Sequence, residues 1–271
     1  MDWIRWLQSV FLGIVQGLTE FLPVSSSAHL NIMPWLFKWE NISDSFDLAL
    51  HAGTLLAILI YFYKDWFSLV KGGVKIVAKK NTSHEGRLFW YIIAATIPAG
   101  VIGLLLEKLI EFLVGESLNV EMMVISIALI VMGVVLYIVD KKASSKIDYE
   151  KIGFKNAFFV GVSQAIAAAL PGTSRSGITM TIARGMGIER ESAARLSFLM
   201  SAPIVAAAVL LSVGDFTFSV EFFLGVIASF VSGLLVIKFL MSYLKRGSYK
   251  IFAIYRVVVG VIILAVAIFR I

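Results

Sequence analysis

Long apolar runs alternate with short charged segments along the whole chain. A helix that spans a bilayer needs about 20 consecutive apolar residues. Six runs approach that length, and they cover 46–63, 88–106, 121–139, 195–213, 220–240 and 252–270. The pattern therefore predicts an all-α, polytopic membrane protein with about six transmembrane helices.

Two further apolar stretches, 3–37 and 156–187, are interrupted in the middle. Pro23 interrupts the first and Pro171-Gly172 the second, because proline cannot continue a regular helix. The second halves are too short or too polar to cross a membrane alone, although 3–22 is long enough for a crossing by itself. Irregular backbone at membrane depth is stable only where protein or a water-filled cavity satisfies its amides. We therefore expect two re-entrant helix–loop–helix pairs.

Composition supports this class. Hydrophobic residues make up 59% of the chain and charged residues 15%, against about 25% charged residues in an average soluble domain, and the mean hydropathy is +0.89. We interpret residues 1–271 as a single integral-membrane domain. Cysteine is absent, which excludes disulfides, thiolate nucleophiles and thiolate metal sites. The net charge of +6 lies between the apolar runs, which does not suggest nucleic-acid binding.

The charges between the runs predict an orientation. Segments 64–87, 140–155 and 238–250 are rich in lysine and arginine, whereas 40–47 and 107–121 are acidic. Basic loops of membrane proteins tend to face the cytoplasm. We therefore place the three basic segments inside and the two acidic segments outside.

The stretch GIVQGLTEFLPVSSSAH, residues 13–29, recurs in altered form 148 positions later. The matched pairs are Gly13 and Gly161, Gln16 and Gln164, Leu22 and Leu170, and Pro23 and Pro171. A cleaved signal peptide would not recur in mid-chain, so the repeat excludes that interpretation. We expect repeat 1 to cover about 1–139 and repeat 2 about 150–271. Three spans separate the copies, so the second is inverted and the two turns should meet near mid-membrane, where such proteins bind ligands.

The differences between the copies indicate where the chemistry lies. At a shift of 148, Ser26 falls on Ser174, Glu20 on Ala168, Ser27 on Arg175 and His29 on Gly177. The first copy thus carries an acid and an imidazole, and the second carries a guanidinium.

Glu20 is the strongest candidate in the first copy, because a carboxylate in an apolar segment is costly and usually functional. Its charge needs a cation, Arg175 or a proton as partner. Gln16 lies one helical turn before it, and the two oxygens suit Mg²⁺ or Ca²⁺. Ser26 can serve as a nucleophile or a hydrogen-bond donor, and His29 as a nucleophile or a proton carrier. Ser25 and Ser27 add hydroxyls, although serines of membrane helices often bond to their own backbone.

The second turn reads PGTSRSG. Gly172 and Gly177 should let the backbone turn sharply and approach a ligand. Arg175 offers a planar fork for phosphate oxygens, against the alternative of an arginine that reaches the membrane surface or pairs with an acid. The flanking hydroxyls that we expect to bind the same ligand are Thr173, Ser174 and Ser176. The other histidines, His51 in a span and His84 in a basic loop, are expected to be structural.

The motifs QGLTEFLPVSSSAH and PGTSRSG together resemble the bacterial undecaprenyl-diphosphate phosphatase family, the integral-membrane type linked to bacitracin resistance. The resemblance covers essentially the whole chain. The paired acidic motif of that family takes Glu or Gln first and Glu second, here Gln16 and Glu20. Its active-site serine, histidine and arginine correspond to Ser26, His29 and Arg175.

The resemblance implies removal of the terminal phosphate of undecaprenyl diphosphate, which returns the carrier monophosphate to cell-wall synthesis. It implies a divalent cation, for which Mg²⁺ and Ca²⁺ are the candidates, and a site on the outer side of the cytoplasmic membrane. Gln16 in place of an acid weakens any scheme in which both positions supply negative charge. Ser26 and His29 both remain candidates for the nucleophile. The expected partners are a polyprenyl diphosphate lipid and the bilayer, with a homodimer as a candidate assembly.

A secondary transporter or lipid flippase is the main alternative, because such proteins commonly combine inverted repeats with broken helices. A scaffold without chemistry would explain neither Glu20 nor Arg175.

Overall fold

The computed structural model describes residues 2–39, 44–79, 82–114 and 117–270, and this part of the chain is helical without a β-strand. Its helices are α1 (Asp2–Phe21), α2 (Ser26–Phe37), α3 (Asp44–Tyr61), α4 (Tyr63–Val77), α5 (His84–Val114), α6 (Leu118–Lys142), η1 (Tyr149–Lys151), α7 (Phe154–Val162), α8 (Gln164–Ala169), α9 (Arg175–Gly185), α10 (Arg190–Leu211), η2 (Val213–Asp215), α11 (Val220–Leu244) and α12 (Lys250–Phe269). The all-α prediction is confirmed.

The expected membrane spans correspond to helices of the structure. Among the described residues, five helices are long and apolar enough to cross a membrane, or up to six if a bent pair counts as one span. The five are α5, α6, α10, α11 and α12. They contain the expected spans 88–106, 121–139 and 220–240, and they overlap 195–213 and 252–270 except for the last two residues and the last residue, respectively. The span expected at 46–63 is α3, which passes this test only together with α4.

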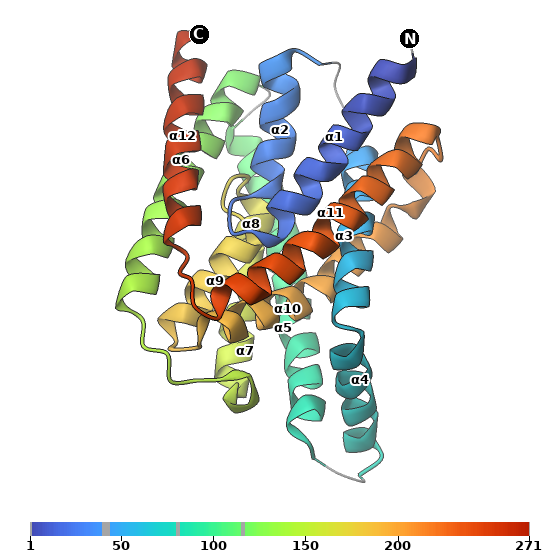
Figure 1. Ribbon diagram of the computed structural model, residues 1–271, viewed down its shortest axis with the longest axis vertical. Helices are drawn as coiled ribbons and strands as arrows, with labels where there is room; N and C mark the ends of the chain where they lie inside the picture. Colours follow the sequence, from blue (N-terminus) through green and yellow to red (C-terminus); the bar gives the residue numbers. More distant parts are fainter. Residues whose placement is uncertain (1, 40–43, 80–81, 115–116, 271) are drawn as a thin grey trace.

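Helix α4 was not expected, because residues 64–87 were predicted to form a loop between spans. The chain bends by 77° between α3 and α4 and then forms a hairpin of α4 and α5 that projects at the lower end of Figure 1. The two helices approach closely at glycines, because a Cβ atom on Gly72 would lie 2.7 Å from the amide nitrogen of Gly86. The positive charges of this segment therefore sit on a helical hairpin.

The two interrupted stretches enter the molecule from opposite ends. Figure 1 shows α1 and α2 descending and returning from the end where the termini lie, whereas α7 begins in the lower half and α8 lies above it. The interruption of the first stretch gives one turn between α1 and α2. The second stretch contains an additional break at Ser163, where the amide of Ile166 bonds the Ser163 carbonyl in a tighter turn (3.2 Å).

The turns of the two pairs meet inside the molecule, as expected. The first turn comprises Leu22–Ser25 and the second Leu170–Ser174. Ser176 at the start of α9 donates a hydrogen bond to the carbonyl of Leu22 (3.1 Å). Close packing of α1 against α11 holds the first pair in place, since a Cβ atom on Gly17 would lie 2.6 Å from the amide nitrogen of Gly233. Such approaches of small residues are how membrane helices pack tightly.

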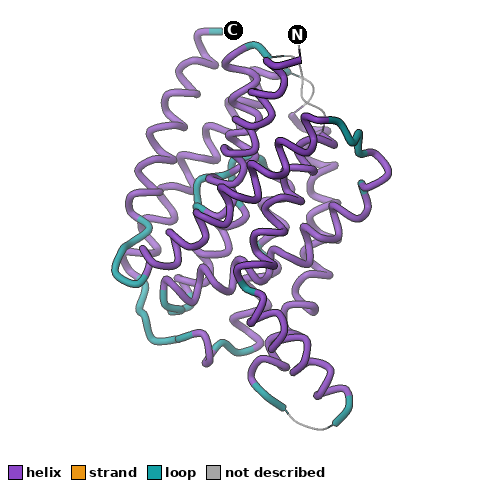
Figure 2. Tube along the Cα trace, turned by 45° about the vertical axis from the view of Figure 1, so that its right-hand side comes forward, coloured by secondary structure: helices purple, strands orange, loops and turns teal. Residues whose placement is uncertain are grey.

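Two of the three basic segments, 64–87 and 140–155, lie toward the end of the molecule opposite the chain termini. In Figures 1 and 2 the α4–α5 hairpin and the α6–η1 connection lie toward the lower end, while the termini and the connection after α10 lie toward the upper end. Parts of the expected loops, residues 40–43, 80–81 and 115–116, lie outside the described residues. The shared end of these two segments agrees with the positive-inside tendency.

A buried ionic cluster joins several helix ends beside the α6–η1 connection. Asp140 at the end of α6 accepts hydrogen bonds from Nε of Arg184 (2.8 Å) and from Nε of Arg190 (2.9 Å). The Tyr249 amide also bonds this carboxylate (3.3 Å). Arg184 is 1% exposed and donates further to Ser145 Oγ (3.1 Å). Because α6, α9, α10 and the start of α12 converge on one carboxylate, the cluster fixes these helix ends.

Candidate active site

Each re-entrant turn ends in a serine that caps the following helix. Ser25 precedes α2 with φ 77°, and Ser174 precedes α9 with φ 70°. The Ser25 hydroxyl accepts a hydrogen bond from the Ala28 amide (3.3 Å) and the Ser174 hydroxyl accepts one from the Gly177 amide (3.1 Å). Serine caps stabilise helix starts, while positive φ at a residue with a side chain is strained and clusters at functional sites. These two serines are therefore local determinants of the turns.

The equivalent caps correct the alignment of the two copies. Since Ser25 and Ser174 play the same part, Ser26 corresponds to Arg175 and Ser27 to Ser176, one position away from the alignment at a shift of 148. The second turn contains one residue more between its proline and its cap. Gly172 takes the additional position with φ +89°, and a Cβ atom there would lie 2.6 Å from the Ile125 carbonyl oxygen. The expected sharp turn at Gly172 is thus present.

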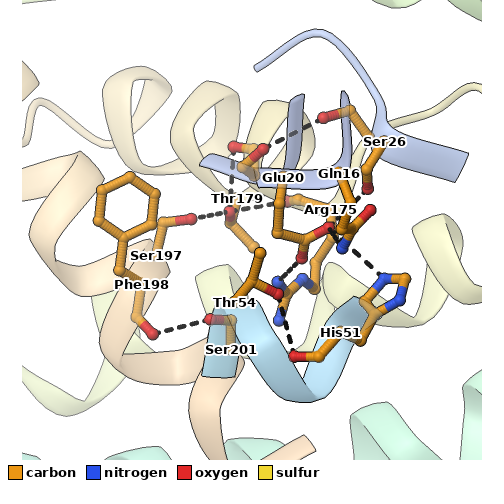
Figure 3. A network of polar contacts seen from close by, with 12 residues as sticks. Gln16, Glu20, Ser26, His51, Thr54, Arg175, Thr179, Ser197, Phe198 and Ser201 are labelled. Atoms are coloured by element: carbon orange, nitrogen blue, oxygen red, sulfur yellow. Dashed lines mark hydrogen bonds and ion pairs between the residues drawn. The ribbon is translucent and has the colours of Figure 1, made fainter. Parts of the chain in front are cut away.

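Glu20 is the centre of the polar network shown in Figure 3. Its side chain is 4% exposed and forms an ion pair with Nη2 of Arg175 through Oε1. Its other oxygen, Oε2, accepts hydrogen bonds from Ser26 Oγ (2.5 Å) and from Gln16 Nε2 (3.0 Å). Four predicted residues from α1, α2 and α9 therefore meet around one buried carboxylate.

His51 also lies beside this centre, a contact that the expectation of a structural histidine did not include. Its Nε2 lies 3.5 Å from Glu20 Oε2, and its side chain is 25% exposed. Nδ1 bonds the Asp47 carbonyl at 2.9 Å, and since a carbonyl only accepts, Nδ1 carries a proton. The ring is thereby held with Nε2 toward Glu20. Helix packing of α3 against α1 brings the two together, and the signal available in the sequence was an ionisable side chain within an apolar span.

His29 lies in a different environment. Its Nδ1 is 2.7 Å from the Ser25 carbonyl and its Nε2 is 2.7 Å from the hydroxyl of Tyr255. The imidazole is stacked on the Tyr255 ring with 5.7 Å between centroids, and the residue is 4% exposed. Both ring nitrogens are thus engaged by groups outside the Glu20 network.

The remaining predicted ligands lie beside the two serine caps. Ser27 is exposed and lies 3.2 Å from the Ser25 hydroxyl, and Ser176 makes the corresponding contact with Ser174 (3.2 Å). Gly177 lies within α9, so it does not make the sharp turn that we expected of it. Thr173 is buried beside the second cap.

Several polar atoms around the turns have no hydrogen-bond partner although they are buried. In the described part of the chain these include Gln16 Oε1, Gln164 Oε1, Thr173 Oγ1 and Arg175 Nη1. An unpaired buried polar atom costs about 1–3 kcal/mol, and native proteins rarely retain one without a reason. Arg175 Nη1 and the Thr173 hydroxyl are donors, as phosphate oxygens require, and Gln16 Oε1 is an acceptor or cation ligand. Two donors and one acceptor without partners therefore lie close to the meeting point of the turns.

Fold and site together define a polytopic membrane protein in which two opposed re-entrant turns meet around a carboxylate–guanidinium pair. Residues 9–262 match the model of the family described as "Bacitracin resistance protein BacA". The chain belongs to this family.

Curated relatives match almost the whole chain. A protein named undecaprenyl-diphosphatase from Caldicellulosiruptor bescii is 47% identical over 268 residues, which are 97% of this chain and 98% of the relative. Proteins of the same name from Desulforudis audaxviator and Moorella thermoacetica are 46% and 44% identical. They cover 97% and 96% of this chain and 98% and 97% of their own lengths.

Proposed function

We infer that this chain is an undecaprenyl-diphosphatase. It hydrolyses undecaprenyl diphosphate to undecaprenyl phosphate and inorganic phosphate, which restores the lipid carrier of cell-wall synthesis, and it belongs to a family described by bacitracin resistance. The observation in the chain itself that supports this conclusion is the meeting of Glu20, Ser26 and Arg175. Unpaired hydrogen-bond donors that could bind a phosphate lie beside them. A polyprenyl tail can remain in the bilayer while the diphosphate reaches the two turns.

Arg175 and Thr173 are proposed to bind the terminal phosphate. Nη2 of Arg175 is held by Glu20, so Nη1 is the donor that remains for a phosphate oxygen. The Thr173 hydroxyl is a second donor of this kind. Helix α9 begins at Arg175, and the free amides at a helix start favour an anion. Donors fixed before the reaction stabilise charge that develops as the phosphorus–oxygen bond breaks.

Ser26 is proposed as the nucleophile, and its geometry supports this role better than that of His29. Its hydroxyl already donates to Glu20, which can accept the proton as Oγ attacks the terminal phosphorus. The bond to the bridging oxygen then breaks, and undecaprenyl phosphate leaves with that oxygen. In the second step water attacks the phosphorus, the phosphorus–Oγ bond of the phosphoserine breaks, and Glu20 returns its proton to Ser26 Oγ. Inorganic phosphate leaves with the hydroxyl of the water, and the second proton of the water goes to solvent. His29, bonded to Tyr255 and to the main chain, is proposed to fix the start of α2.

Two residues of this site could supply part of the ligands of a divalent cation. Glu20 offers a carboxylate, and Gln16 Oε1 is a buried oxygen without a partner, both of the kind that Mg²⁺ and Ca²⁺ prefer. In the described residues no group of three or more His, Cys, Asp or Glu could hold a metal by itself, so phosphate oxygens would complete the ligands. A bound cation would supply charge neutralisation on the phosphate.

The site is proposed to face the outer side of the bacterial cytoplasmic membrane. The first re-entrant pair enters from the end opposite the basic segments (Figure 1), which by the positive-inside tendency is the outer end.

Phosphate release from a polyprenyl diphosphate by purified protein in detergent tests the proposal, because transport cannot register there. We expect multiple turnovers that Ser26→Ala lowers by at least about a hundredfold. Ser126→Ala is the matched control, since this buried hydroxyl bonds only its own helix at Met122 O (2.6 Å). Well-folded protein that binds the lipid but releases no phosphate would refute the assignment.

A further inference from the structure

Arg256 lies within the apolar helix α12 and is fully buried, with 0% exposure. Its guanidinium reaches both re-entrant turns. Nη1 donates to the Pro23 carbonyl of the first turn (3.2 Å), and Nη2 donates to the carbonyls of Gly172 and Thr173 in the second turn (2.9 Å each). Nε points to the Leu129 carbonyl of α6 (3.4 Å). One side chain thus joins four main-chain carbonyls on three separate segments.

The three turn carbonyls, those of Pro23, Gly172 and Thr173, need a donor from outside their own segment. They belong to turns inside the membrane region, where neither helical bonding nor bulk water is available and an unpaired carbonyl is costly. Every hydrogen bond that Arg256 donates within the described residues goes to the main chain. A guanidinium has five N–H donors in a rigid plane, so it can bond both turns at once in one relative position.

Gly177 provides the space for this guanidinium. A Cβ atom on Gly177 would lie 2.6 Å from Nη1 of Arg256 and 3.0 Å from the Cβ atom of Ser174. The guanidinium is held on several sides by carbonyls and cannot move away freely. A side chain at position 177 would therefore displace the guanidinium of Arg256 or the Ser174 side chain.

The neighbouring residue of α12 contacts the first re-entrant pair as well. The Tyr255 hydroxyl lies 2.7 Å from His29 Nε2, and the two rings are stacked with 8° between their planes. A single turn of α12 therefore bonds α2 and both re-entrant turns.

We propose that Arg256 is a positioning residue that locks the two re-entrant turns together. Glu20 precedes the first turn and Arg175 follows the second, so the relative position of the turns decides whether the catalytic groups meet. Catalysis depends steeply on such alignment. The effect on turnover rests on the proposed phosphatase function, whereas the coupling of the turns is measurable without substrate.

The coupling is tested with Val24→Cys, a probe in the first turn. Val24 is 3% exposed and the chain contains no cysteine, so the probe should react slowly with a small thiol reagent in detergent. We expect Arg256→Gln to raise the labelling rate about tenfold, the size of one charge-assisted hydrogen bond, and Arg256→Lys to raise it less. Arg184→Gln is the matched control, because Arg184 is an equally buried arginine in the ionic cluster around Asp140.

Turnover per folded molecule is the second measurement. We expect Arg256→Gln to lower kcat at least about tenfold with little change in KM, because the hydrogen-bond donors for the phosphate remain while Glu20 is displaced. Arg256→Lys should recover part of the loss in kcat. Arg184→Gln should lower thermal stability without either change. Gly177→Ala, which displaces the guanidinium without removing it, gives the same two readouts if Arg256→Gln does not fold.

Two results would overturn the proposal. One is unchanged labelling of Val24→Cys in the Arg256 variants. The other is an equal rise in the Arg184 control, which would indicate general loosening of the fold. A third result concerns the function alone. If the Arg256 variants raise the labelling rate of Val24→Cys but the parent protein has no phosphatase activity, the proposed function is refuted and the coupling of the turns stands.

Discussion

The carboxylate of Glu20 pairs with the guanidinium of Arg175 across the meeting point of the two re-entrant turns, although 155 positions separate them in the sequence. Nη2 of Arg175 makes this contact, while the buried Nη1 has no partner in the described structure. The arginine is therefore oriented by one half of the molecule and presents a free donor at the point where the halves meet. Glu20 is oriented in turn by Ser26 and Gln16.

Arg175→Lys tests whether the fork of the guanidinium matters. Charge is retained, but a lysine ammonium is a point donor and cannot bond Glu20 and a phosphate oxygen in the same plane. We expect kcat/KM for a polyprenyl diphosphate to fall about a hundredfold, the usual cost of removing one oriented donor. Arg195→Lys is the control, because Arg195 pairs with Asp65 and covers the Tyr149 ring, away from the turns. Near-normal turnover of Arg175→Lys would remove Arg175 from phosphate binding.

Asp140→Ala should separate stability from catalysis. Asp140 is 5% exposed and forms ion pairs with Arg184 and Arg190. Its removal leaves buried positive charge without a partner, which should lower the free energy of unfolding by about 3–5 kcal/mol. Thermal unfolding in detergent measures this cost, and turnover per folded molecule should remain that of the parent protein. Asp148→Ala, which breaks an exposed pair with Lys151, should leave the melting temperature almost unchanged. Equal melting temperatures for both variants would show that the cluster does not stabilise the fold.

The orientation in the membrane is accessible through single cysteines, because the chain has none of its own. Lys146→Cys lies in the exposed connection after α6, and Asp215→Cys lies in the exposed connection after α10. If the basic segments face the cytoplasm, an impermeant thiol reagent on intact cells should label position 215 and spare position 146. Both positions should react after permeabilisation. Labelling of position 146 alone would reverse the orientation and place the first re-entrant pair on the inner side.

The two re-entrant turns could be predicted because their causes are local. Pro23 and Pro171-Gly172 interrupt helices by their own backbone chemistry, and a carboxylate in an apolar stretch indicates function wherever it occurs. Glu20, Gln16, Ser26 and Arg175 were selected by such local signals, and the structure brings them into one network.

The features that sequence analysis missed depend on contacts between distant helices. His51 reaches Glu20 only because α3 packs beside α1, and nothing in the sequence near His51 specifies that neighbour. The one-residue offset between the two turns could not be predicted either. The ungapped alignment pairs Ser25 with Thr173, whereas the helix caps show that Ser25 is equivalent to Ser174. Arg256 did carry a signal, a lone arginine within an apolar span, but its partners are carbonyls from both turns.

Glu20→Gln distinguishes a catalytic carboxylate from a structural one. The amide preserves the shape of the side chain, but its single oxygen can accept from only one of Arg175 and Ser26, which bond different oxygens of Glu20. It also cannot take the Ser26 proton and is a weaker cation ligand. We expect the variant to fold and turnover to fall about a thousandfold. Gln16→Ala is the graded control: it removes a neutral ligand, so it should cost less and should be partly offset by more magnesium or calcium. Melting temperature and turnover are measured on both variants across a range of magnesium and calcium concentrations. If Glu20 serves only to pair with Arg175, Glu20→Gln will lower the melting temperature and keep parental turnover at low cation, which would end its assignment as proton acceptor and cation ligand.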